Sequence, residues 1–480
     1  MDFKNIFKIL SLIGMTISAI FLSDILIAYI YKEPFIELLK VNTFFFSINF
    51  LIWLLLYKHE LNLNIKESIL SVNLLWILLG ILGAIPLFIY TNISFSSSFF
   101  EAVSGFTTTG ATVYTDIESL PHLILFHRSL MHWLGGLGVI VLGVGLLSMI
   151  NPSGSLSLFK AESTGVQLEK HTPKIKNTAL TLWGIYALLT FIDMLFLKYF
   201  GMSWFDALNH SFSTISTGGF STKNNSLGYF KDDGIIWTTT IFMILSGINF
   251  LAHLKLLHKD FSGFKTEEVK WYLSIGLILS LTLTFIHIDI GGDSFYDAFK
   301  HSSFTIASVI TTTGFATVDY GGWSHFAIAV IFIAMLIGGN AGSTAGGIKV
   351  IRHVIIFKTI QSEIKRILSP NNIISVFIDK QKQPQRILSS SFGFFTLFMI
   401  TVGVMTIYIY ARGYDAMSSI SAAFALVGNI GPGFSLVGPS DNFAFFSDTD
   451  KIIFSFAMII GRLECYTFFV LLSSKFWKQF

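Results

Sequence analysis

The sequence has very little cysteine and little charge for its length. It contains 480 residues but a single cysteine, Cys465, which excludes a disulfide framework and a cysteine-rich metal site. Only 13% of the residues are charged, about half the share in an average soluble protein, whereas 52% are hydrophobic. A large soluble protein would need polar helical faces to cover such a core, and the sequence offers none. The composition therefore predicts a polytopic membrane protein.

Patterns that mark enzymes are also missing. The chain shows no nucleotide-binding fingerprint, no pairing of a nucleophile with a base, and no spacing of His, Cys or acidic residues typical of a metal site. We therefore expect a protein that is not an enzyme, that binds no organic cofactor and that has no nucleic-acid partner.

Long apolar segments are what the sequence has in abundance. A helix needs about 20 apolar residues to cross a hydrocarbon core about 30 Å thick. The segments that meet this requirement predict ten transmembrane spans, at residues 6–31, 35–57, 68–90, 121–150, 176–200, 235–257, 271–291, 323–350, 387–411 and 452–474.

Lysine and arginine are concentrated in alternate connections between these spans. They lie at the start of the chain and after spans two, four, six and eight, where the last group runs from Lys349 to Arg386. The other connections are poor in basic residues and often acidic, as in TDIESLP and HIDIGGDS. Because basic connections stay in the cytoplasm, the pattern predicts that both termini are cytoplasmic.

One pattern recurs after spans three, five, seven and nine. A segment too short to span is followed by small polar residues and a glycine, in FFEAVSGFTTTGATVY, WFDALNHSFSTISTGGFST, FYDAFKHSSFTIASVITTTGFAT and YDAMSSISAAFALVGNIGPGFS. The glycines Gly110, Gly218, Gly314 and Gly431 lie 108, 96 and 117 residues apart. A unit made of a span, a re-entrant helix, a loop and a second span is therefore repeated four times.

Loops of this kind can bind a dehydrated cation. Non-helical backbone at membrane depth is tolerated where it is buried in protein or lines a water-filled pathway. Four loops around one axis would present rings of carbonyl oxygens, as in a potassium filter, and Thr or Ser would add hydroxyl oxygens. The short helices would direct their negative C-terminal ends at the axis, which favours cations. Ordinary extracellular turns are the alternative, but they do not account for four copies in register.

The four units resemble the TrkH/TrkG and KtrB potassium transporters of bacteria over residues 68–476, with TTTGAT, STGGFST, TTTGFAT and GNIGPG as the filter motifs. Two additional N-terminal spans are typical of the TrkH/TrkG branch, so the chain is similar to that branch. The resemblance implies an all-α polytopic membrane protein, in which four repeats of M1, pore helix, filter and M2 surround one pore in a pseudo-fourfold arrangement. The expected units are the N-terminal pair at 1–66 and the repeats at 67–160, 161–265, 266–385 and 386–480.

The resemblance also assigns filter residues, which would bind K+ as the transported ion. They are Thr108, Thr109, Gly110, Ser216, Thr217, Gly218, Thr312, Thr313, Gly314, Asn429, Ile430 and Gly431. The fourth loop departs from the others, with Asn and Ile where they have Thr or Ser pairs. None of the loops contains the TVGYG run of tetrameric potassium channels, so we expect weaker discrimination against sodium.

Span eight contains a second unusual stretch, IGGNAGSTAGGIKVIR. Glycine destabilises a helix by about 1 kcal/mol relative to alanine, so we expect the helix to break here. The stretch lacks the ending of a phosphate-binding loop. Two interpretations remain, a helix-packing face with small residues at every fourth position and a flexible gate loop beneath the filter, which is the role that the resemblance implies. The gate residues would be Gly338, Gly339, Asn340, Gly342, Ser343, Thr344, Gly346 and Gly347.

Arg462 lies near the middle of span ten, where a charge costs about 3 kcal/mol or more and usually faces a cavity or a partner. Glu464 points to a different helical face and is a poor partner. Either Arg462 pairs with another acidic side chain, or it lines the pore below the filter as part of the gate, as the resemblance implies. Four further polar residues lie within spans, and interhelical hydrogen bonds explain them more simply than a proton relay: Asp24, Asp193, His132 and Asn249.

The sequence and the resemblance together predict potassium uptake by a multi-pass protein of the bacterial inner membrane, embedded in the lipid bilayer. The resemblance implies a homodimer with one pore per subunit and a cytosolic NAD- or ATP-binding regulatory ring of the TrkA type. A potassium-conducting subunit of an ATP-driven complex and a strictly proton- or sodium-coupled symporter remain alternatives, because all of them need a similar filter. Residues 364–385 are expected to form a solvated cytosolic linker.

Overall fold

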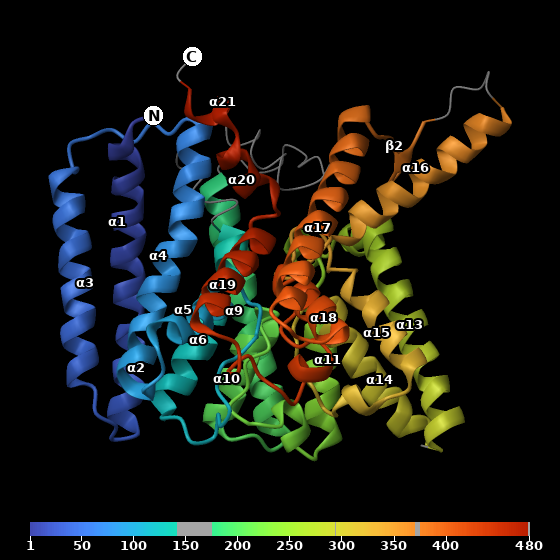
Figure 1. The fold of residues 1–480 in the computed structure, drawn as a ribbon, viewed down its shortest axis with the longest axis horizontal. Coiled ribbons are helices and arrows are strands. Elements are labelled where there is room, and N and C mark those ends of the chain that lie inside the picture. Colours follow the sequence, from blue (N-terminus) through green and yellow to red (C-terminus); the bar gives the residue numbers. More distant parts are fainter. Residues whose placement is uncertain (142–174, 293, 370–374, 479–480) are drawn as a thin grey trace.

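Long and short helices make up the described part of the chain. The computed structural model describes residues 1–141, 175–292, 294–369 and 375–478. The long helices run side by side along one direction, and both termini lie at the same end of the molecule (Figure 1). The short helices labelled α5, α10, α14 and α18 lie in the half away from the termini (Figure 1).

The N-terminal helices lie outside the repeats, at one side of the molecule (Figure 1). Helices α1 (Phe3–Ile20) and α2 (Leu22–Ile30) together form one candidate span, and α3 (Ile36–Leu55) runs back beside it. The side-chain amide of Asn42 on α3 donates to the carbonyl of Ser18 on α1 at 2.8 Å. The two extra N-terminal spans that the sequence predicts are therefore present.

Each repeat contains an outer helix, a short pore helix, a loop and an inner helix. The outer helices are α4 (Ile65–Thr91), α9 (Ile175–Tyr199), α13 (Glu267–Gly291) and α17 (Gln385–Ala411). The pore helices are α5 (Phe95–Phe106), α10 (Trp204–Ile215), α14 (Phe295–Ile310) and α18 (Ala416–Val427). The inner helices are α6 (His122–Val141), α11 (Asp233–Ser246) with α12 (Phe250–Leu257), α15 (His325–Met335) with α16 (Val350–Leu368), and α19 (Asp448–Arg462) with α20 (Tyr466–Phe469).

Shorter elements complete the described chain. They are the 3-10 turns η2 (Ser226–Tyr229), η3 (Phe261–Lys265), η4 (Tyr320–Gly322), η5 (Ser435–Val437) and η6 (Val470–Leu472), the C-terminal helix α21 (Ser474–Trp477), and the strands β1 (Phe377–Ile378) and β2 (Gln381–Lys382). The strands pair antiparallel, with Phe377 opposite Lys382. The segment predicted to be a linker, residues 364–385, thus carries the end of α16 and a small hairpin.

The described residues contain fewer continuous spans than the ten predicted for the chain. Among the described residues, six helices are long and apolar enough to cross a membrane, and two bent pairs raise the number to eight. The predicted span 121–150 continues past Val141, outside the described residues. The predicted span 323–350 is not one helix, because α15 ends at Met335, and the sequence anticipated a break there.

Two other predicted spans, 235–257 and 452–474, are wrong as single helices. Helices α11 and α12 meet at 98°, and α19 meets α20 at 110°. The side chain of Asn249 accepts the N–H of Leu251 at 2.8 Å, which starts a new helix after the first bend. After α19, both Glu464 and Cys465 take a φ of 55°, a left-handed backbone that a right-handed helix cannot continue through.

The four pore helices are too short to cross the membrane. They contain 12 to 16 residues and are therefore about 18 to 24 Å long. Each begins at a side-chain cap, in which Ser94, Ser203, Ser294 or Asp415 accepts the N–H of the residue three positions later. The caps fix where each helix starts, so each helix delivers its C-terminal end to the interior of the protein.

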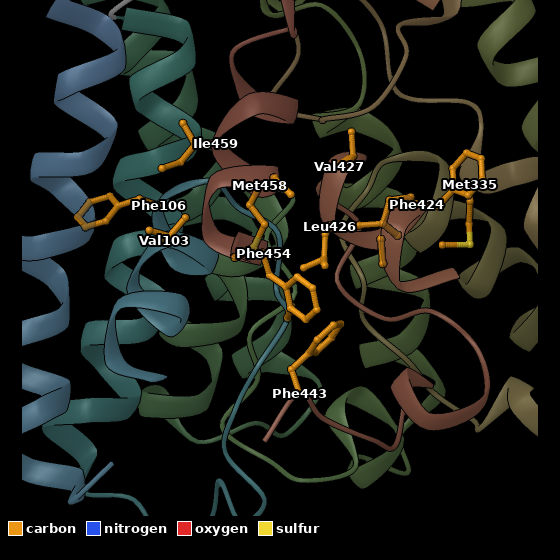
Figure 2. Packing of buried hydrophobic residues seen from close by; sticks show 14 of the residues in the cluster. Val103, Phe106, Met335, Phe424, Leu426, Val427, Phe443, Phe454, Met458 and Ile459 are labelled. Carbon is orange, nitrogen blue, oxygen red and sulfur yellow. The ribbon is translucent and has the colours of Figure 1, made fainter. Parts of the chain in front are cut away.

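Large apolar side chains pack the pore helices against the inner helices. Leu426 near the end of α18 lies close to Phe454 of α19, and Phe443 lies on the other side of Phe454 (Figure 2). The ring centroids of Phe443 and Phe454 are 6.4 Å apart, and both side chains are buried. Because lipid is as apolar as these side chains, close packing rather than water exclusion holds the pore helices in place.

Candidate functional site

The four pore helices end in the same backbone turn. In the first, the N–H of Thr109 donates to the carbonyl of Ser104 at 2.9 Å and the N–H of Thr108 donates to that of Gly105 at 3.1 Å. The other three helices repeat both hydrogen bonds. This Schellman motif places the first residue past the C-cap in the left-handed region. We call the four residues that begin at each C-cap loops 1 to 4: residues 107–110, 216–219, 311–314 and 428–431.

The left-handed residues of the four turns are Thr108, Thr217, Thr312 and Asn429, with φ between 53° and 56°. All four are at most 1% exposed. A β-branched residue at positive φ is strained by about 1 to 3 kcal/mol and persists only where the surroundings impose the conformation. The sequence assigned all four to the candidate filter, and the structure places them at equivalent positions.

In every loop a glycine lies two residues after the left-handed residue. In loop 2 this glycine is not the one that the sequence analysis assigned. Gly110, Gly219, Gly314 and Gly431 have φ of 81°, 82°, 83° and 96°. The equivalent of Gly110 is therefore Gly219, and the predicted alignment on Gly218 is wrong by one residue. The STGG motif offers two adjacent glycines, and only the backbone conformation distinguishes them.

Position 218, next to Gly219, is a glycine for a different structural reason. It occupies the position of Thr109, where a Cβ atom would overlap the imidazole of His132. That ring stacks on Phe220 with 4.0 Å between the ring centroids. The His132 ring therefore takes the space that a side chain occupies in the other loops.

The four loops form a closed ring. A Cβ atom at Gly110 would overlap the carbonyl oxygen of Gly218 in loop 2, and one at Gly219 would overlap that of Thr313 in loop 3. The same contact joins Gly314 to Ile430 in loop 4, and Gly431 to Thr109 in loop 1. Each loop thus contacts the next, and the fourth returns to the first, as the pseudo-fourfold arrangement requires.

The carbonyls in this ring lack hydrogen-bond donors. Within the part of the chain that the structure describes, no donor reaches the carbonyl oxygens of Thr109, Gly218, Thr313 and Ile430. All four residues are buried. A buried carbonyl without a partner is unfavourable unless something else supplies positive charge. Four such oxygens from four loops are suited to coordinate a cation.

The side-chain oxygens of the four loops differ in their contacts, although the sequence predicted similar roles for them. The hydroxyls of Thr109 and Thr313 lie 2.7 Å from those of Thr107 and Thr311. In loop 4, Asn429 instead donates to the hydroxyl of Thr109 at 2.9 Å. Among the described residues, no group of three or more His, Cys, Asp or Glu side chains could hold a metal ion. Uncharged oxygens are therefore the candidate ligands.

A cavity of about 140 Å³ opens where the four glycines meet. Its lining includes Gly110, Gly219, Gly314 and Gly431, together with residues that follow them in the chain. Asp441 also lines this cavity, and partial burial, reinforced by nearby Asp319, raises the pKa of its carboxyl. The cavity gives a polar entrance to the ring on the side opposite the pore helices' C-terminal turns.

The other side of the ring contacts the segment between α15 and α16, which we call the glycine-rich loop (residues 336–349). The N–H of Gly346 donates to the hydroxyl of Thr312 at 2.7 Å. The hydroxyl of Thr344 donates to the carbonyl of Ile215, the last residue of α10, at 3.0 Å. A Cβ atom at Gly346 would lie 2.7 Å from the carbonyl oxygen of Gly428. The loop therefore touches parts of loops 3 and 4 and the end of a pore helix.

Backbone hydrogen bonds fasten the glycine-rich loop to the bend between α11 and α12. The N–H of Asn340 donates to the carbonyl of Gly247 at 2.9 Å, and the N–H of Phe250 donates to that of Gly342 at 3.0 Å. Because the loop is not helical, Gly338, Gly342 and Gly346 share no helical face. The helix-packing interpretation of these glycines is therefore wrong.

Arg462 reaches the glycine-rich loop from the last position of α19, rather than from the middle of a continuous span. Its guanidinium donates to the carbonyl of Thr344 at 3.0 Å and to that of Gly135 on α6 at 3.4 Å. Among the described residues, no carboxylate forms an ion pair with it. Glu464 instead pairs with Arg352 at the start of α16.

Residues 38–479 match the family model of TrkH, a cation transport protein. The chain belongs to the TrkH family.

Full-length relatives agree with this assignment to the TrkH family. The Trk system potassium uptake protein TrkH of Salmonella typhimurium is 37% identical, and the alignment covers 100% of both chains. TrkG of Escherichia coli, also a Trk system potassium uptake protein, is 34% identical over 95% of both chains. The crystal structure of the potassium transporter TrkH from Vibrio parahaemolyticus matches with a TM-score of 0.90 and 33% identity, over 100% of both chains.

Sequence reasoning missed three buried charged residues beside the site. Glu268 on α13 accepts the N–H groups of Ala341 and Ile351 at 2.7 and 3.3 Å, and so links the middle of the glycine-rich loop to the start of α16. Glu101 and Arg128 form a buried ion pair beside loops 1 and 2. For Glu101 and Arg128, a charged residue inside a pore helix or an apolar span was the available signal.

The other polar residues within spans have different environments. Asp24 bonds to His127 at 2.8 Å and His132 bonds to the carbonyl of Gly105 at 2.7 Å, so both make the predicted interhelical contacts. Asn249 caps a helix. Asp193 on α9 is buried, and neither of its carboxyl oxygens has a hydrogen-bond partner among the described residues.

Proposed function

We propose that this chain takes up potassium across the bacterial inner membrane through the ring formed by loops 1 to 4. The observation that carries the proposal is the ring of buried carbonyls without donors. Such oxygens replace the hydration shell of a bare alkali cation. The names of the bacterial relatives, which are potassium uptake proteins, support K+ as the transported ion.

Selectivity for cations follows from the ends of the pore helices. Each helix carries a partial negative charge at its C-terminus, and all four helices lead directly into the ring. An ion enters from the cavity, loses water as it passes the four glycines, and is coordinated by the loop carbonyls. The side chains of Thr109, Thr313 and Asn429 hold the loops in shape.

The glycine-rich loop acts as the gate. It lies against the ring on the side opposite the cavity, so it obstructs an ion that leaves the carbonyls. Arg462 adds a positive charge in a low-dielectric setting, where its repulsion of a cation is several-fold stronger than in water. The hydrogen bond from Arg462 to Thr344 holds this charge against the loop.

The same arrangement supports a proposed orientation in the membrane. The cavity faces the exterior, and the end that carries both termini faces the cytosol, where α16 projects from the bundle (Figure 1). The chain forms a homodimer with one pore per subunit, and a cytosolic nucleotide-binding ring of the TrkA type regulates it. Support for these partners comes from the family resemblance and from the Trk system names of the relatives.

Reversal potentials test this function. The purified protein in liposomes is placed under K+, Na+ and pH gradients in turn, and the potential at zero current is measured. A potential that follows the K+ gradient alone supports K+-selective conduction. A potential that shifts with pH or Na+ at fixed K+ supports the coupled symporter, and a potential that ignores K+ overturns the proposal.

A further inference from the structure

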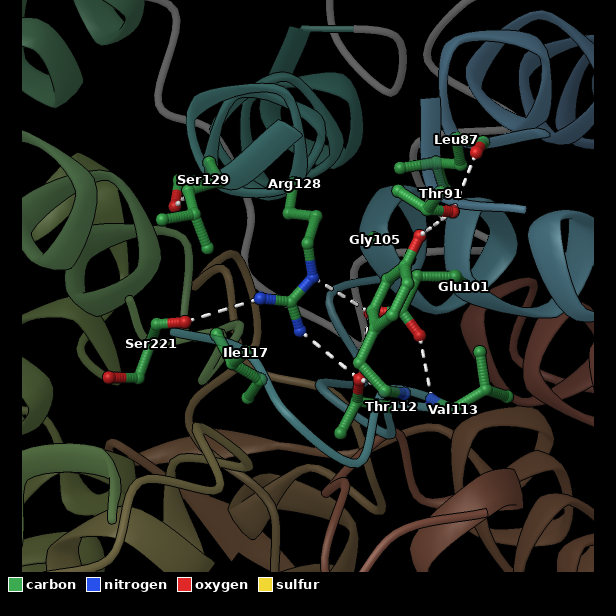
Figure 3. A network of polar contacts seen from close by, with 12 residues as sticks. Leu87, Thr91, Glu101, Gly105, Thr112, Val113, Ile117, Arg128, Ser129 and Ser221 are labelled. Carbon is green, nitrogen blue, oxygen red and sulfur yellow. Dashed lines mark hydrogen bonds and ion pairs between the residues drawn. The ribbon is translucent and has the colours of Figure 1, made fainter. Parts of the chain in front are cut away.

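Arg128 on α6 lies between the segments that follow loops 1 and 2, and it is 1% exposed (Figure 3). Its guanidinium donates from Nε to Glu101 at 2.8 Å, from Nη1 to the carbonyl of Ser221 at 3.2 Å, and from Nη2 to the hydroxyl of Thr112 at 3.2 Å. Thr112 lies two residues after Gly110, and Ser221 lies two residues after Gly219. One planar cation therefore joins two neighbouring walls of the ring.

Glu101 completes this connection from the pore helix α5. Its carboxylate is fully buried and accepts the N–H of Val113 at 2.8 Å and the hydroxyl of Thr112 at 3.0 Å (Figure 3). The pair thus contacts the segment after loop 1 at Thr112 and Val113. Arg128 also contacts the segment after loop 2. Breaking the pair would leave a charge buried without compensation, which is strongly destabilising.

Thr112 extends the connection to the fourth repeat. Its carbonyl accepts the N–H of Phe443 at 2.8 Å, in the segment that follows loop 4. Arg128 also packs over the ring of Phe220, with its guanidinium carbon 4.0 Å from the ring centroid. Segments from three repeats therefore meet at contacts that Glu101 and Arg128 arrange.

The other repeats have no equivalent carboxylate. Glu101 lies six residues before the C-cap of its pore helix, and the matching positions in the other pore helices hold His210, Thr305 and Ala422. The segments that follow loops 2 and 3 are joined instead through the backbone, where the N–H of Gly228 donates to the carbonyl of Ala316 at 3.1 Å. The ion pair is thus a feature of the boundary between repeats 1 and 2.

We propose that Glu101 and Arg128 are a positioning pair, which fixes the separation of loops 1 and 2 and thereby supports discrimination between K+ and Na+. The proposal rests on the proposed function of the ring. A guanidinium makes several directed hydrogen bonds in a rigid plane, so it holds two walls at a fixed spacing better than one flexible ammonium. Neither residue touches the ion, and both act through the backbone beside the glycines.

Two substitutions test the pair, and permeability ratios of the full-length protein in liposomes provide the readout. Arg128→Lys keeps the charge and loses the planar donors, whereas Thr112→Val keeps the ion pair and removes the hydroxyl that links it to loop 1. We expect the K+/Na+ permeability ratio to fall about tenfold in both, which corresponds to about 1.4 kcal/mol. Asp233→Asn is the matched control, because it weakens the Lys300 ion pair away from the loops and leaves the ratio unchanged.

The outcomes separate the pair from the ring itself. If Gly314→Ser changes the ratio and both test variants keep that of the parent, the positioning pair is overturned and the ring stands. If the ratio is unchanged in Gly314→Ser as well, the proposed function fails. Should Arg128→Lys not fold, Thr112→Val decides alone. A variant with less folded protein but the parental ratio indicates a purely structural role and contradicts the proposal.

Discussion

The left-handed threonines show how single residues determine this site. Glycine would adopt the same backbone angles without strain, yet three loops use threonine. In loop 3 the structure gives a reason, because the hydroxyl of Thr312 accepts the N–H of Gly346 from the glycine-rich loop. The strain thus keeps a polar group between the ring and the proposed gate. The glycines two residues later have the opposite requirement, because the neighbouring loop leaves no space for a side chain at those positions.

Gly314→Ser tests that requirement. At a φ of 83°, a side chain is strained, and its Cβ would overlap the carbonyl oxygen of Ile430 in the neighbouring loop. We expect a correctly folded protein in which the K+/Na+ permeability ratio falls about tenfold or uptake is lost, because a displacement of the carbonyl changes its contact with the ion. Growth of a potassium-uptake-deficient host on micromolar K+ measures the loss.

Gly322→Ser is the matched control for this change. Gly322 follows the same loop, but a Cβ atom there would meet nothing within 4 Å, and its φ is not positive. Normal growth and selectivity are expected for it. Normal growth and an unchanged ratio for Gly314→Ser would show that loop 3 is not part of the filter.

Arg462→Ala should conduct alkali cations faster than the parent protein. The substitution removes a positive charge from beneath the ring and the hydrogen bond that holds Thr344. Because no described carboxylate pairs with Arg462, we expect near-normal expression and melting temperature. Arg462→Lys should give a flux between the two. Rb+ uptake into liposomes measures the rate, with Arg366→Ala on the exposed part of α16 as the control. Slower flux in a destabilised protein would contradict the pore-lining position.

At the scale of elements, interrupted helices are the basis of the proposed gated pathway. The inner helices of repeats 2, 3 and 4 all break near the ends of the pore helices. Among the breaks in the described residues, the one in repeat 3 is the longest, and its loop contacts loops 3 and 4 below the ring. Helix α16, which follows that loop, is tied to its neighbours by ion pairs of Arg352 with Glu464 and of Lys358 with Glu267. Movement of α16 would therefore pull directly on the glycine-rich loop.

Deleting residues 341–345 from the glycine-rich loop should raise basal cation flux. The deletion removes an obstruction and leaves the carbonyl ring in place, so K+/Na+ selectivity should stay close to that of the parent. Liposome flux without any cytosolic partner provides the measurement. A well-folded deletion variant with unchanged flux would show that the glycine-rich loop is not the gate.

Glu268→Ala should also raise basal flux, by a smaller factor. Its carboxylate accepts the N–H group of Ala341 within the glycine-rich loop and that of Ile351 at the start of α16, so its loss frees the loop by roughly one or two hydrogen bonds to a charged group, about 1.5 to 3 kcal/mol each. Glu268→Gln keeps an acceptor oxygen and should lie between Glu268→Ala and the parent. Glu363→Ala, at an exposed ion pair on α16, serves as the control. Equal flux in all variants would show that Glu268 plays no part in gating.

At the scale of the whole molecule, the N-terminal extension is joined to the repeats by buried polar contacts. Asp24 on α2 and His127 on α6 are both fully buried, and the second ring nitrogen of His127 faces the carbonyl of Gly83 on α4 at 3.0 Å. Both ring nitrogens of His127 thus make polar contacts, and these connect α6 to α2 and to α4. The pair therefore fixes the position of the extension against the first repeat without contacting the ring.

Asp24→Ala should destabilise the protein without changing its selectivity. Loss of one partner from a buried pair costs about 3 to 5 kcal/mol, because the other partner stays buried without compensation. We expect a clearly lower melting temperature in detergent and a parental K+/Na+ ratio in the protein that remains folded. Glu37→Gln, at an exposed pair on α3, should change neither quantity. A shift in selectivity would instead connect the extension to the filter.

The sequence by itself determined the membrane class, the fourfold repeat and the position of each loop. These follow from local properties: apolar length sets the spans, caps start the pore helices, and glycine marks the turns. Gly110, Gly314 and Gly431, which the sequence singles out for this reason, share one backbone conformation in the structure. The sequence also located the interruption in span eight, because several glycines within one apolar segment cannot maintain a regular helix.

Only the tertiary structure decided which atoms meet. Gly219 rather than Gly218 matches the other loop glycines, because the His132 ring from another helix occupies the side-chain space at Gly218. The bends after Ser246 and Arg462, and the partners of Glu101, Glu268 and Glu464, likewise depend on helices distant in the chain. A buried charge in the sequence signals that a partner is needed, but packing between repeats determines which residue provides it.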